Sequence, residues 1–534
     1  MRVWDAVNAE TTKGEYHIIA GRINDIAWDG ESQRIIAVGD GKERFGHCIT
    51  ADSGNSVGEI SGHSSRINAV GVRQQRPLRA ATGGDDMSLV FLHGAPFKFN
   101  TKIGGRHERF VYGVAFSPDG GWLVSCGADG RVWLYEGKTG EVVKRVGEGE
   151  GHKGSVFGVA WAPDSRRFAT CGGDQTVRVW EVESGKCVRC WRMGEEGKVS
   201  VQDQQVGITW PAGRSDGLII SLDLEGNLNY FKEEEDRPVR VVMGHQKAIN
   251  AAGVIQDGKT LWTGSAEGRA RCWDIATGTS KTVDGEMHSN YVSSIVPSPS
   301  EGRIYSVGWD DTLRTIDSSQ CSFTGNVAKT DGQPKAAAVA TSGGKAFTLV
   351  ATINGLRVYS EGSQLESPKL PTPPTCVAAS EELVATGADD KIIRVFKITS
   401  SGSLEALTEL KDATSPISTL AFSPSGSHLA AGLSNGKIFV YSASSGSWAL
   451  ETNRWSAHTA RVTTVAWSPD GKKAASGGLD TNVFVWSLAD PGKRIKALNA
   501  HKEGVGAVAW VDDAKVISCG ADAAVKVWKV EGVP

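Results

Sequence analysis

Short apolar stretches recur along the chain and are separated by turn sequences. Val156–Trp161, Val462–Trp467 and Val505–Trp510 are examples of the apolar stretches, and Pro118-Asp119-Gly120 and Pro163-Asp164-Ser165 are examples of the turns. Short runs of β-branched and aromatic residues bounded by Gly, Pro and Asp predict strands joined by tight turns. No long stretch has the spacing of an amphipathic helix. The pattern therefore predicts an all-β protein.

The apolar stretches belong to a longer repeat that opens with a Gly-His or Ala-His pair and ends near Trp-Asp. The opening residues His63, His107 and His152 are 44 and 45 residues apart. Repeats start near residues 21, 63, 107, 152, 198, 245, 288, 330, 372, 415, 458 and 501. A period of about 40–45 residues with these ends is typical of the four-stranded blades of a β-propeller.

Four polar or aromatic positions keep a fixed spacing within a repeat. After His152, Thr170 lies four residues before Asp174 and Trp180 lies six residues after it. The same positions hold His245, Thr263, Glu267 and Trp273; His458, Ser476, Asp480 and Trp486; and His501, Ser518, Asp522 and Trp528. We expect a buried relay in which the acid accepts from the histidine, because an unpaired buried polar group costs about 1–3 kcal/mol. Recurrence at blade spacing favours this structural relay over a Ser/His/Asp hydrolase.

The number of repeats predicts two propellers in tandem, because one ring typically holds four to eight blades. We expect an N-terminal propeller over residues 1–244 and a C-terminal propeller over residues 245–534. Met1–Asp5 reads as the third strand of a blade whose first half is absent, so the first propeller is expected to be incomplete, with five full repeats. The second keeps seven repeats, and its last blade lacks an outer strand. About one and a half blades are expected to be missing before Met1.

Composition restricts the possible partners. The net charge is −3 and the isoelectric point about 6.4, which argues against nucleic acid and anionic membranes. The sequence has no apolar stretch of membrane-spanning length and no secretory signal, so we expect a cytoplasmic monomer. Nine scattered cysteines are expected to be buried thiols. Cys187-Val188-Arg189-Cys190 has redox or zinc spacing but no second pair, so neither a metal nor a cofactor is expected.

Three departures from the repeat fall in neighbouring repeats. Gly39–Gly46 replaces a short turn with a longer charged loop that carries Glu43. Asp85 precedes the relay acid Asp86 and is expected to project from the turn. Phe110 stands three residues after a blade-opening histidine, where other repeats carry small or charged residues. The loops open at one end of the propeller, so an acidic and aromatic binding patch is expected. Plain packing of Phe110 and solvated turn acids remain open.

Several segments outside the general repeat pattern resemble actin-interacting protein 1, a family of double-propeller cofactors of cofilin. They are Val38–His47, Asp52–Ile60, Ala95–Phe99 and Asp203–Gly207, and the similarity extends to Val505–Trp528. The resemblance implies two seven-bladed propellers and binding to cofilin-decorated actin filaments. It also implies promotion of their severing, disassembly and end capping, and a place in the cortical patches of the actin cytoskeleton. It further implies that Glu43, Asp85, Phe99 and Phe110 contribute to this activity. Three of these residues are departures from the repeat described above, and Phe99 is not.

Two other classes of function remain as alternatives. A general WD-repeat scaffold, for example in ribosome assembly or a ubiquitin ligase, often carries basic tails or an added helical domain, and this chain has neither. A propeller enzyme needs a cluster of histidines or carboxylates outside the repeat pattern, whereas the histidines here mostly mark blade starts. We therefore expect a non-enzymatic protein that binds the cofilin-altered filament better than the bare one and shifts the filament population by linkage.

Overall fold

The computed structural model describes residues 1–5, 12–194, 197–214, 216–255, 258–298, 302–444 and 447–532. Throughout these ranges the regular structure consists of strands, as predicted, and none of the residues forms a helix. The chain divides into two compact units, Met1–Val242 and Met243–Pro534. This division lies two residues from the one expected between residues 244 and 245.

In the part of the first unit that the structure describes, one two-stranded sheet is followed by five four-stranded sheets. The strands are β1 (Arg2–Trp4) and β2 (Thr12–Glu15); β3 (Ile23–Trp28), β4 (Arg34–Gly39), β5 (Gly46–Thr50) and β6 (Ser56–Glu59); β7 (Ile67–Val72), β8 (Arg79–Gly84), β9 (Leu89–His93) and β10 (Lys98–Ile103); β11 (Val111–Phe116), β12 (Trp122–Gly127), β13 (Val132–Glu136) and β14 (Val142–Val146); β15 (Val156–Trp161), β16 (Arg167–Gly172), β17 (Thr176–Glu181) and β18 (Cys187–Arg192); and β19 (Gln205–Thr209), β20 (Ile219–Asp223), β21 (Leu228–Phe231) and β22 (Arg240–Val242).

The described residues of the second unit form six four-stranded sheets and a final three-stranded sheet. The strands are β23 (Ile249–Val254), β24 (Thr260–Ser265), β25 (Ala270–Asp274) and β26 (Ser280–Thr282); β27 (Val292–Pro297), β28 (Arg303–Gly308), β29 (Thr312–Asp317) and β30 (Ser322–Lys329); β31 (Pro334–Ser342), β32 (Lys345–Thr352), β33 (Gly355–Ser360) and β34 (Ser363–Gln364); β35 (Pro374–Ser380), β36 (Leu383–Ala388), β37 (Ile393–Ile398) and β38 (Leu404–Leu410); β39 (Ile417–Phe422), β40 (His428–Leu433), β41 (Lys437–Ser444) and β42 (Ser447–Ser456); β43 (Val462–Trp467), β44 (Lys473–Gly478), β45 (Val483–Ser487) and β46 (Arg494–Ala497); and β47 (Val505–Asp512), β48 (Lys515–Gly520) and β49 (Val525–Lys529).

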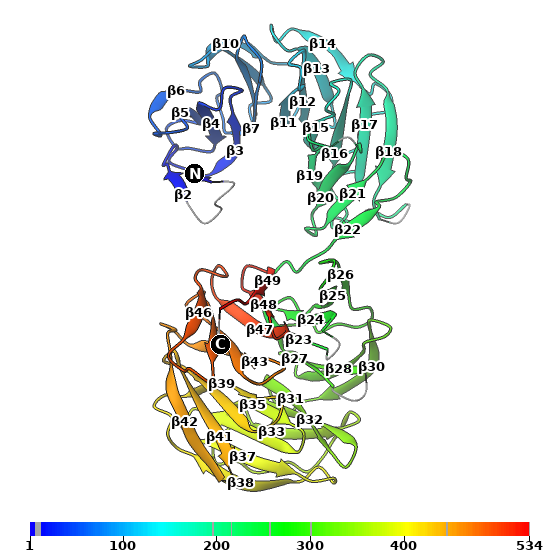
Figure 1. Ribbon diagram of the computed structural model, residues 1–534. Helices are drawn as coiled ribbons and strands as arrows, with labels where there is room; N and C mark the ends of the chain where they lie inside the picture. Colours follow the sequence, from blue (N-terminus) through cyan, green and yellow to red (C-terminus); the bar gives the residue numbers. More distant parts are fainter. Residues whose placement is uncertain are drawn as a thin grey trace. The chain divides into compact units, whose positions relative to one another are not determined.

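Every four-stranded sheet is an antiparallel meander in sequence order, which is the blade of a propeller. In the second unit the innermost strands lie side by side around a common centre, and β47 of the last blade packs against β23 of the first (Figure 1). At this junction a side chain on Gly506 would collide with the carbonyl oxygen of Ile249, so the close approach requires glycine. The seven blades therefore form a closed ring.

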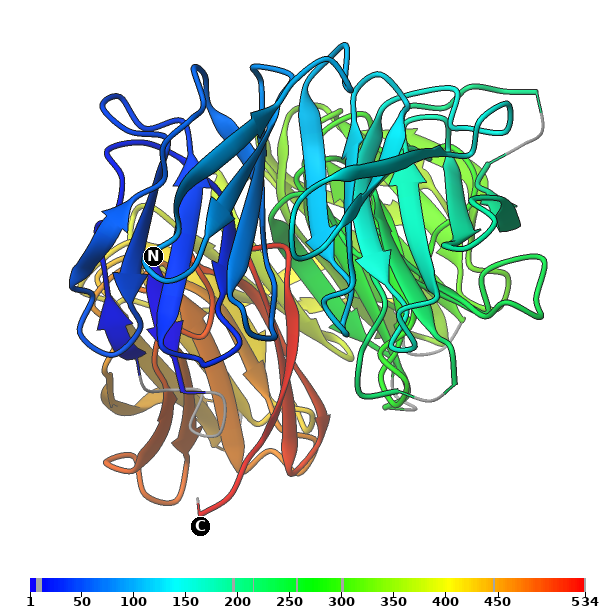
Figure 2. The same ribbon diagram turned by 90° about the horizontal axis from the view of Figure 1, so that it is seen from above.

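In the first unit β3, β7, β11, β15 and β19 are the innermost strands and neighbour one another in that order. The blades follow each other along an arc that begins with the two-stranded sheet, as the two views show (Figures 1 and 2). Because the loop into a blade and the turn between its second and third strands lie at the same end of an antiparallel meander, loops from neighbouring blades share one end of the unit.

The core lies between neighbouring blades. The second strands are almost wholly buried, as in β16 and β44, because a neighbouring sheet covers each face, whereas fourth strands such as β38 are largely exposed. Phe168 and Trp180 of one blade pack with Leu134 of the preceding blade in a single apolar cluster. Large side chains from two sheets thus fill each interface, which is the packing expected of sheets stacked face to face.

A β-bulge follows the first residue of most innermost strands. In β7 the register shifts between Ile67 and Ala69, and in β43 between Val462 and Thr464. The skipped residue is Asn68 in β7 and Thr463 in β43. Bulges re-aim side chains, and these two donate to the next blade: Asn68 to the carbonyl of Val111 at 3.2 Å and Thr463 to that of Val505 at 2.5 Å.

Candidate binding site on the first unit

Polar relays fix the loops at the end of the blade that carries the loop into it and the turn between its second and third strands. In the fourth full blade, His152 bonds to Asp174 at 2.9 Å and to Thr170 at 2.7 Å, and the indole of Trp180 donates to Thr170 at 2.7 Å. Asp174 also accepts from the backbone amide of Lys153 at 3.0 Å. The acid therefore joins the turn after the second strand to the loop that opens the blade, which we call the opening loop.

The same relay recurs in the second unit. His458 bonds to Asp480 and Ser476 at 2.9 Å each, and Trp486 donates to Ser476 at 2.8 Å. The last blade repeats the set at 2.7 Å in each bond, with His501, Asp522, Ser518 and Trp528. The histidine and hydroxyl groups are buried in every case. These hydrogen bonds stabilise the individual blades, because each group is paired with a neighbour in the same blade.

Burial and hydrogen bonding oppose each other at the relay acids. Burial acts to raise the pKa of Asp174, but the hydrogen bonds from His152, Thr176 and the amide of Lys153, with the charge of His152, together hold that pKa well below its usual range. Burial lowers the pKa of His458, and the hydrogen bond that this histidine donates to Asp480 only partly offsets the effect. The relay acid is therefore stabilised in its ionised form.

The spacing rule extends to blades whose residues differ. In the blade opened by His107, Tyr135 replaces tryptophan and its hydroxyl lies 3.0 Å from that of Ser125. In the blade opened by His245, Glu267 replaces aspartate and lies 3.5 Å from the imidazole Nδ1. The longer acid thus makes a looser contact than the 2.7–3.1 Å of the aspartates.

Glu43 lies in the loop between β4 and β5. The base of this loop is tied down, because Asp40 exchanges hydrogen bonds with the backbone of Arg22 and the amide of Gly39 donates to the carbonyl of Phe45 at 2.7 Å. Phe45 packs against the apolar core between blades. Glu43 at the tip is exposed and makes no ion pair with any residue that the structure describes. The base of the loop is therefore fixed, and the Glu43 carboxylate at its tip is open to solvent.

Asp85 does not project from its turn as the sequence suggested. Its side chain is only 11 % exposed, and its carboxylate accepts from Arg66 and from the amide of Asn68 at 2.8 Å. The relay in this blade runs through Asp86 instead, which bonds to His63 at 2.9 Å and to Lys102 at 2.8 Å. The extra acid has a partner because the bulge at Asn68 turns that amide toward it.

Phe110 stands at the end of the opening loop of the next blade and is 40 % exposed. Its ring meets Tyr112 edge-on, with centroids 6.4 Å apart, and Tyr112 in turn lies 5.5 Å from Phe157 of the following blade. Offset and edge-on aromatic pairs of this kind restrain their rings. Phe110 is therefore packed along one side and open to solvent on the other.

Phe99 lies on β10, the outermost strand of its blade, and is 49 % exposed. Its ring covers Gly62 in the opening loop, where the backbone φ of +112° and the close ring both favour glycine. The register of β10 shifts just after Phe99, between Phe99 and Thr101. The ring thus packs on the same loop that leads to the relay histidine His63.

These four residues come from three neighbouring blades. Glu43 and Phe110 lie on loops at the same end and are open to solvent, Asp85 is held within its own blade by Arg66 and Asn68, and Phe99 lies on the outer strand beside the opening loop. Because Arg66 compensates the charge of Asp85, the acidic character of the patch rests on Glu43 rather than on two acids. We refer to Glu43, Asp85, Phe99 and Phe110 as the first-unit patch.

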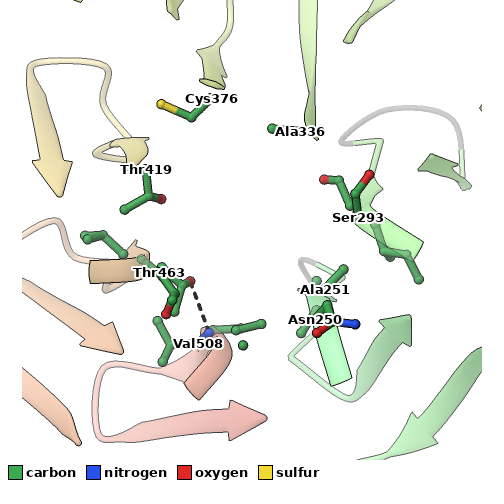
Figure 3. A pocket seen from close by; sticks show the side chains of 18 of the residues that line it. Asn250, Ala251, Ser293, Ala336, Cys376, Thr419, Thr463 and Val508 are labelled. Atoms are coloured by element: carbon green, nitrogen blue, oxygen red, sulfur yellow. Dashed lines mark hydrogen bonds between the residues drawn. The ribbon is translucent and has the colours of Figure 1, made fainter. Parts of the chain in front are cut away.

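The second unit contains a central channel of about 1220 Å³. Small side chains from its innermost strands, such as Ser293, Cys376 and Thr419, point into it (Figure 3). Most hydroxyls there are used within the wall, as where Thr464 accepts from the amide of Val508 at 3.2 Å. At the mouth, the exposed side chain of Trp309 stacks on Tyr291 with centroids 4.3 Å apart.

The part of the chain that the structure describes contains no cluster of three or more metal-ligating side chains. Cys187 and Cys190 both lie on β18, where a register shift at Val188 sets them opposite Trp180 and Arg178 of β17. Among the described segments, no helix is long and apolar enough to cross a membrane.

Comparison with known proteins agrees with the blade pattern. The family model "WD domain, G-beta repeat" matches residues 100–136, 143–181, 236–274, 404–442, 450–487 and 492–529. Together with the antiparallel four-stranded sheets, these matches define an all-β protein of tandem WD-repeat propellers.

Several relatives match nearly the whole chain. Actin-interacting protein 1 of Drosophila melanogaster is 38 % identical over 100 % of this chain, and the protein of the same name from Caenorhabditis elegans is 34 % identical over 99 %. WD repeat-containing protein 1 of Gallus gallus is 36 % identical over 99 %. Each alignment covers 86 % of the relative. The chain belongs to this family of actin-interacting protein 1 and WD repeat-containing protein 1, so the resemblance noted in the sequence is confirmed.

Proposed function

We propose that this protein binds actin filaments that carry cofilin and promotes their severing, disassembly and end capping. The observation that carries the proposal is the match over nearly the full chain to relatives named actin-interacting protein 1. Glu43 and Phe110, open to solvent at one end of neighbouring blades, supply a contact surface of suitable chemistry. An exposed aromatic beside a charged rim is a common arrangement in binding hot spots.

The proposed mechanism involves no covalent chemistry on this chain. Cofilin changes the state of the filament, and a protein that binds the changed state better than the bare one shifts the population toward it by its difference in affinity. Loops with tied bases suit this task, because a preorganised surface loses little freedom on binding. The protein would act in the cytoplasm, at the actin cytoskeleton.

The first experiment is sedimentation of actin filaments with the chain, with and without cofilin, scoring the chain in the pellet and actin in the supernatant. The proposal expects co-pelleting and released actin only when cofilin is present. Circular dichroism on the same preparation separates a folded inactive chain from an unfolded one. A folded chain that neither pellets nor releases actin would contradict the proposal.

A scaffold for a multiprotein complex is the second candidate, and one observation favours it. The residue that directly follows the second strand is an exposed apolar side chain in three blades of the second unit: Trp309, Ile353 and Leu479. Exposed aromatic and aliphatic residues around a propeller mouth are typical of protein contacts. A folded chain without cofilin-dependent binding would favour this candidate over the first.

A further inference from the structure

Two cysteines far apart in the sequence meet between the first two blades of the second unit. Cys272 lies on β25, the third strand of its blade, and Cys321 lies at the turn just before β30 of the next blade. Both pack into one apolar cluster, together with Phe323. Each thiol shifts the pKa of the other across this cluster. Each is partly exposed, so small solutes can reach the pair.

The backbone holds the two cysteines in place. Cys272 pairs with Lys281 on β26, and the next residue, Thr282, has its carbonyl oxygen 4.0 Å from the sulfur of Cys321. Beyond it, the amide of Asp284 donates to the carbonyl of Cys321 at 3.0 Å, and the amide of Phe323 donates back to Asp284 at 2.8 Å. The two blades are thus joined by main-chain bonds that hold Cys321 beside β26, the strand that pairs with Cys272.

The two thiols differ in their electrostatic environment. The hydrogen bond from Cys321, opposed by burial and assisted by the charge of Lys281, holds the pKa of the Cys272 thiol below its usual range. Burial instead raises the pKa of Cys126, Cys376 and Cys519 to about 12. Because the thiolate is the reactive form, this pair stands apart from the buried cysteines.

We propose that Cys272 and Cys321 form a dithiol site that reacts with low-molecular-weight disulfides such as oxidised glutathione, closing a disulfide between the two blades. The Cys272 thiolate attacks one sulfur of glutathione disulfide, so a mixed disulfide forms and one glutathione thiolate leaves. The sulfur of Cys321 then attacks Cys272, the bond to glutathione breaks, and the Cys321 proton passes to a departing glutathione thiolate. Two protein thiols are oxidised and one glutathione disulfide is reduced to two thiols.

The bridge would link positions 49 residues apart, on the outer side of the ring. A covalent link across that loop restricts the unfolded chain more than the folded one. The oxidised protein is therefore expected to open less readily between its first two blades. The spacing of Cys187 and Cys190 looks more like a redox motif, but burial raises the pKa of both thiols, which disfavours the reactive thiolate.

The test uses the full chain and needs no partner. The protein is incubated with oxidised glutathione, trapped with acid, digested without reduction and mapped by mass spectrometry. We expect a peptide linked through Cys272 and Cys321 to appear before any other disulfide. Limited alkylation of the untreated protein is expected to label Cys272 at least several-fold faster than Cys190, which is also exposed.

Variants separate the two steps. In Cys321→Ser the second attack cannot occur, so glutathione is expected to accumulate on Cys272 as a stable adduct. In Cys272→Ser neither the adduct nor the linked peptide is expected, and Cys190→Ser is the matched control that leaves both unchanged. Linkage through other cysteines, no adduct in Cys321→Ser, or equal labelling of Cys272 and Cys190 would each overturn the proposal. The alkylation comparison uses the unmodified chain, so it holds even if a variant folds poorly.

Discussion

The side-chain amide of Asn68 donates to Asp85 Oδ1 at 2.8 Å and, from the same nitrogen, to the carbonyl oxygen of Val111 at 3.2 Å. One amide thus connects an acid on the second full blade of the first unit to the start of the third. Val111 directly follows Phe110, so this bond reaches the base of the exposed aromatic. Asp85 therefore helps to set the spacing between the two loops of the first-unit patch.

Replacing Asp85 by alanine is expected to loosen this junction. Asn68 and Arg66 both lose a partner, and a buried polar group left unpaired costs about 1–3 kcal/mol. Hydrogen exchange followed by mass spectrometry should show faster exchange in β7 and β11. Asp236→Ala, at an exposed acid of the same unit, is the control and should leave both strands unchanged. Unchanged exchange with lost filament binding would mean that Asp85 contacts the partner directly.

Phe110→Ala is expected to weaken cofilin-dependent binding without unfolding the unit. An aromatic anchor in an interface typically contributes about 2 kcal/mol or more, which is about thirtyfold in affinity. The remaining edge-on partner, Tyr112, still packs against Phe157, so the fold should tolerate the change. Co-sedimentation over a range of filament concentrations measures the loss.

Val188→Ala is the matched control for Phe110→Ala, because Val188 is an exposed apolar residue on the outer strand β18. It should bind as the unmodified chain does. If both variants weaken binding equally, the loss does not come from a specific contact of Phe110.

Glu43→Gln is expected to reduce binding mainly at low salt. Glu43 is exposed, and a charge at the rim of an interface acts largely through long-range attraction, which salt screens within about 10 Å at 0.1 M. The variant should therefore bind several-fold more weakly at low ionic strength and nearly normally at high ionic strength. Glu141→Gln, an exposed acid at the opposite end of a blade of the same unit, should show no salt-dependent change. Equal loss at all salt concentrations would exclude a steering role.

The repeat pattern alone predicts the blades well. The apolar runs Val156–Trp161 and Val462–Trp467 coincide with β15 and β43, because an innermost strand must be apolar where blades pack together. The histidine spacing likewise locates each opening loop. Phe110 is found by its departure from a position where other repeats carry small or charged residues. Local sequence is sufficient in these cases because each feature depends on its own blade.

Contacts between strands are what the sequence does not reveal. Asp85 reads as a surplus acid in its turn, but its partner Asn68 becomes available only through a bulge in β7. Cys272 and Cys321 belong to different repeats, so no local spacing connects them, whereas Cys187 and Cys190 have suggestive spacing but lie on either side of a register shift in β18. Such features depend on strand register and on the packing of blades, which residue spacing alone does not encode.

Removing a relay acid is expected to destabilise its blade in proportion to how closely it contacts the histidine. Asp480 lies 2.9 Å from His458 and 3.0 Å from the amide of Thr459, whereas Glu267 lies 3.5 Å from His245 and 3.3 Å from the amide of Gln246. Asp480→Ala should therefore cost more, about 1–3 kcal/mol, than Glu267→Ala. Hydrogen exchange in the two opening loops measures both, and equal effects would contradict the argument from distance.

Acidification is expected to destabilise the second unit in two stages. Burial lowers the pKa of His245 and His458 from the ordinary 6.5, so the unfolded imidazoles take up protons first and stability falls as the pH drops below that value. Burial acts to raise the pKa of Asp480, but the hydrogen bonds from His458 and the amide of Thr459, with the charge of His458, together outweigh it and the net shift is downward from 3.8. Its contribution is therefore present above pH 3.8 and is lost below it. Thermal unfolding from about pH 7.5 to about pH 5 isolates the histidine stage. His458→Gln should flatten the slope and His17→Gln, at an exposed site, should not; greater stability at pH 5 would contradict the prediction.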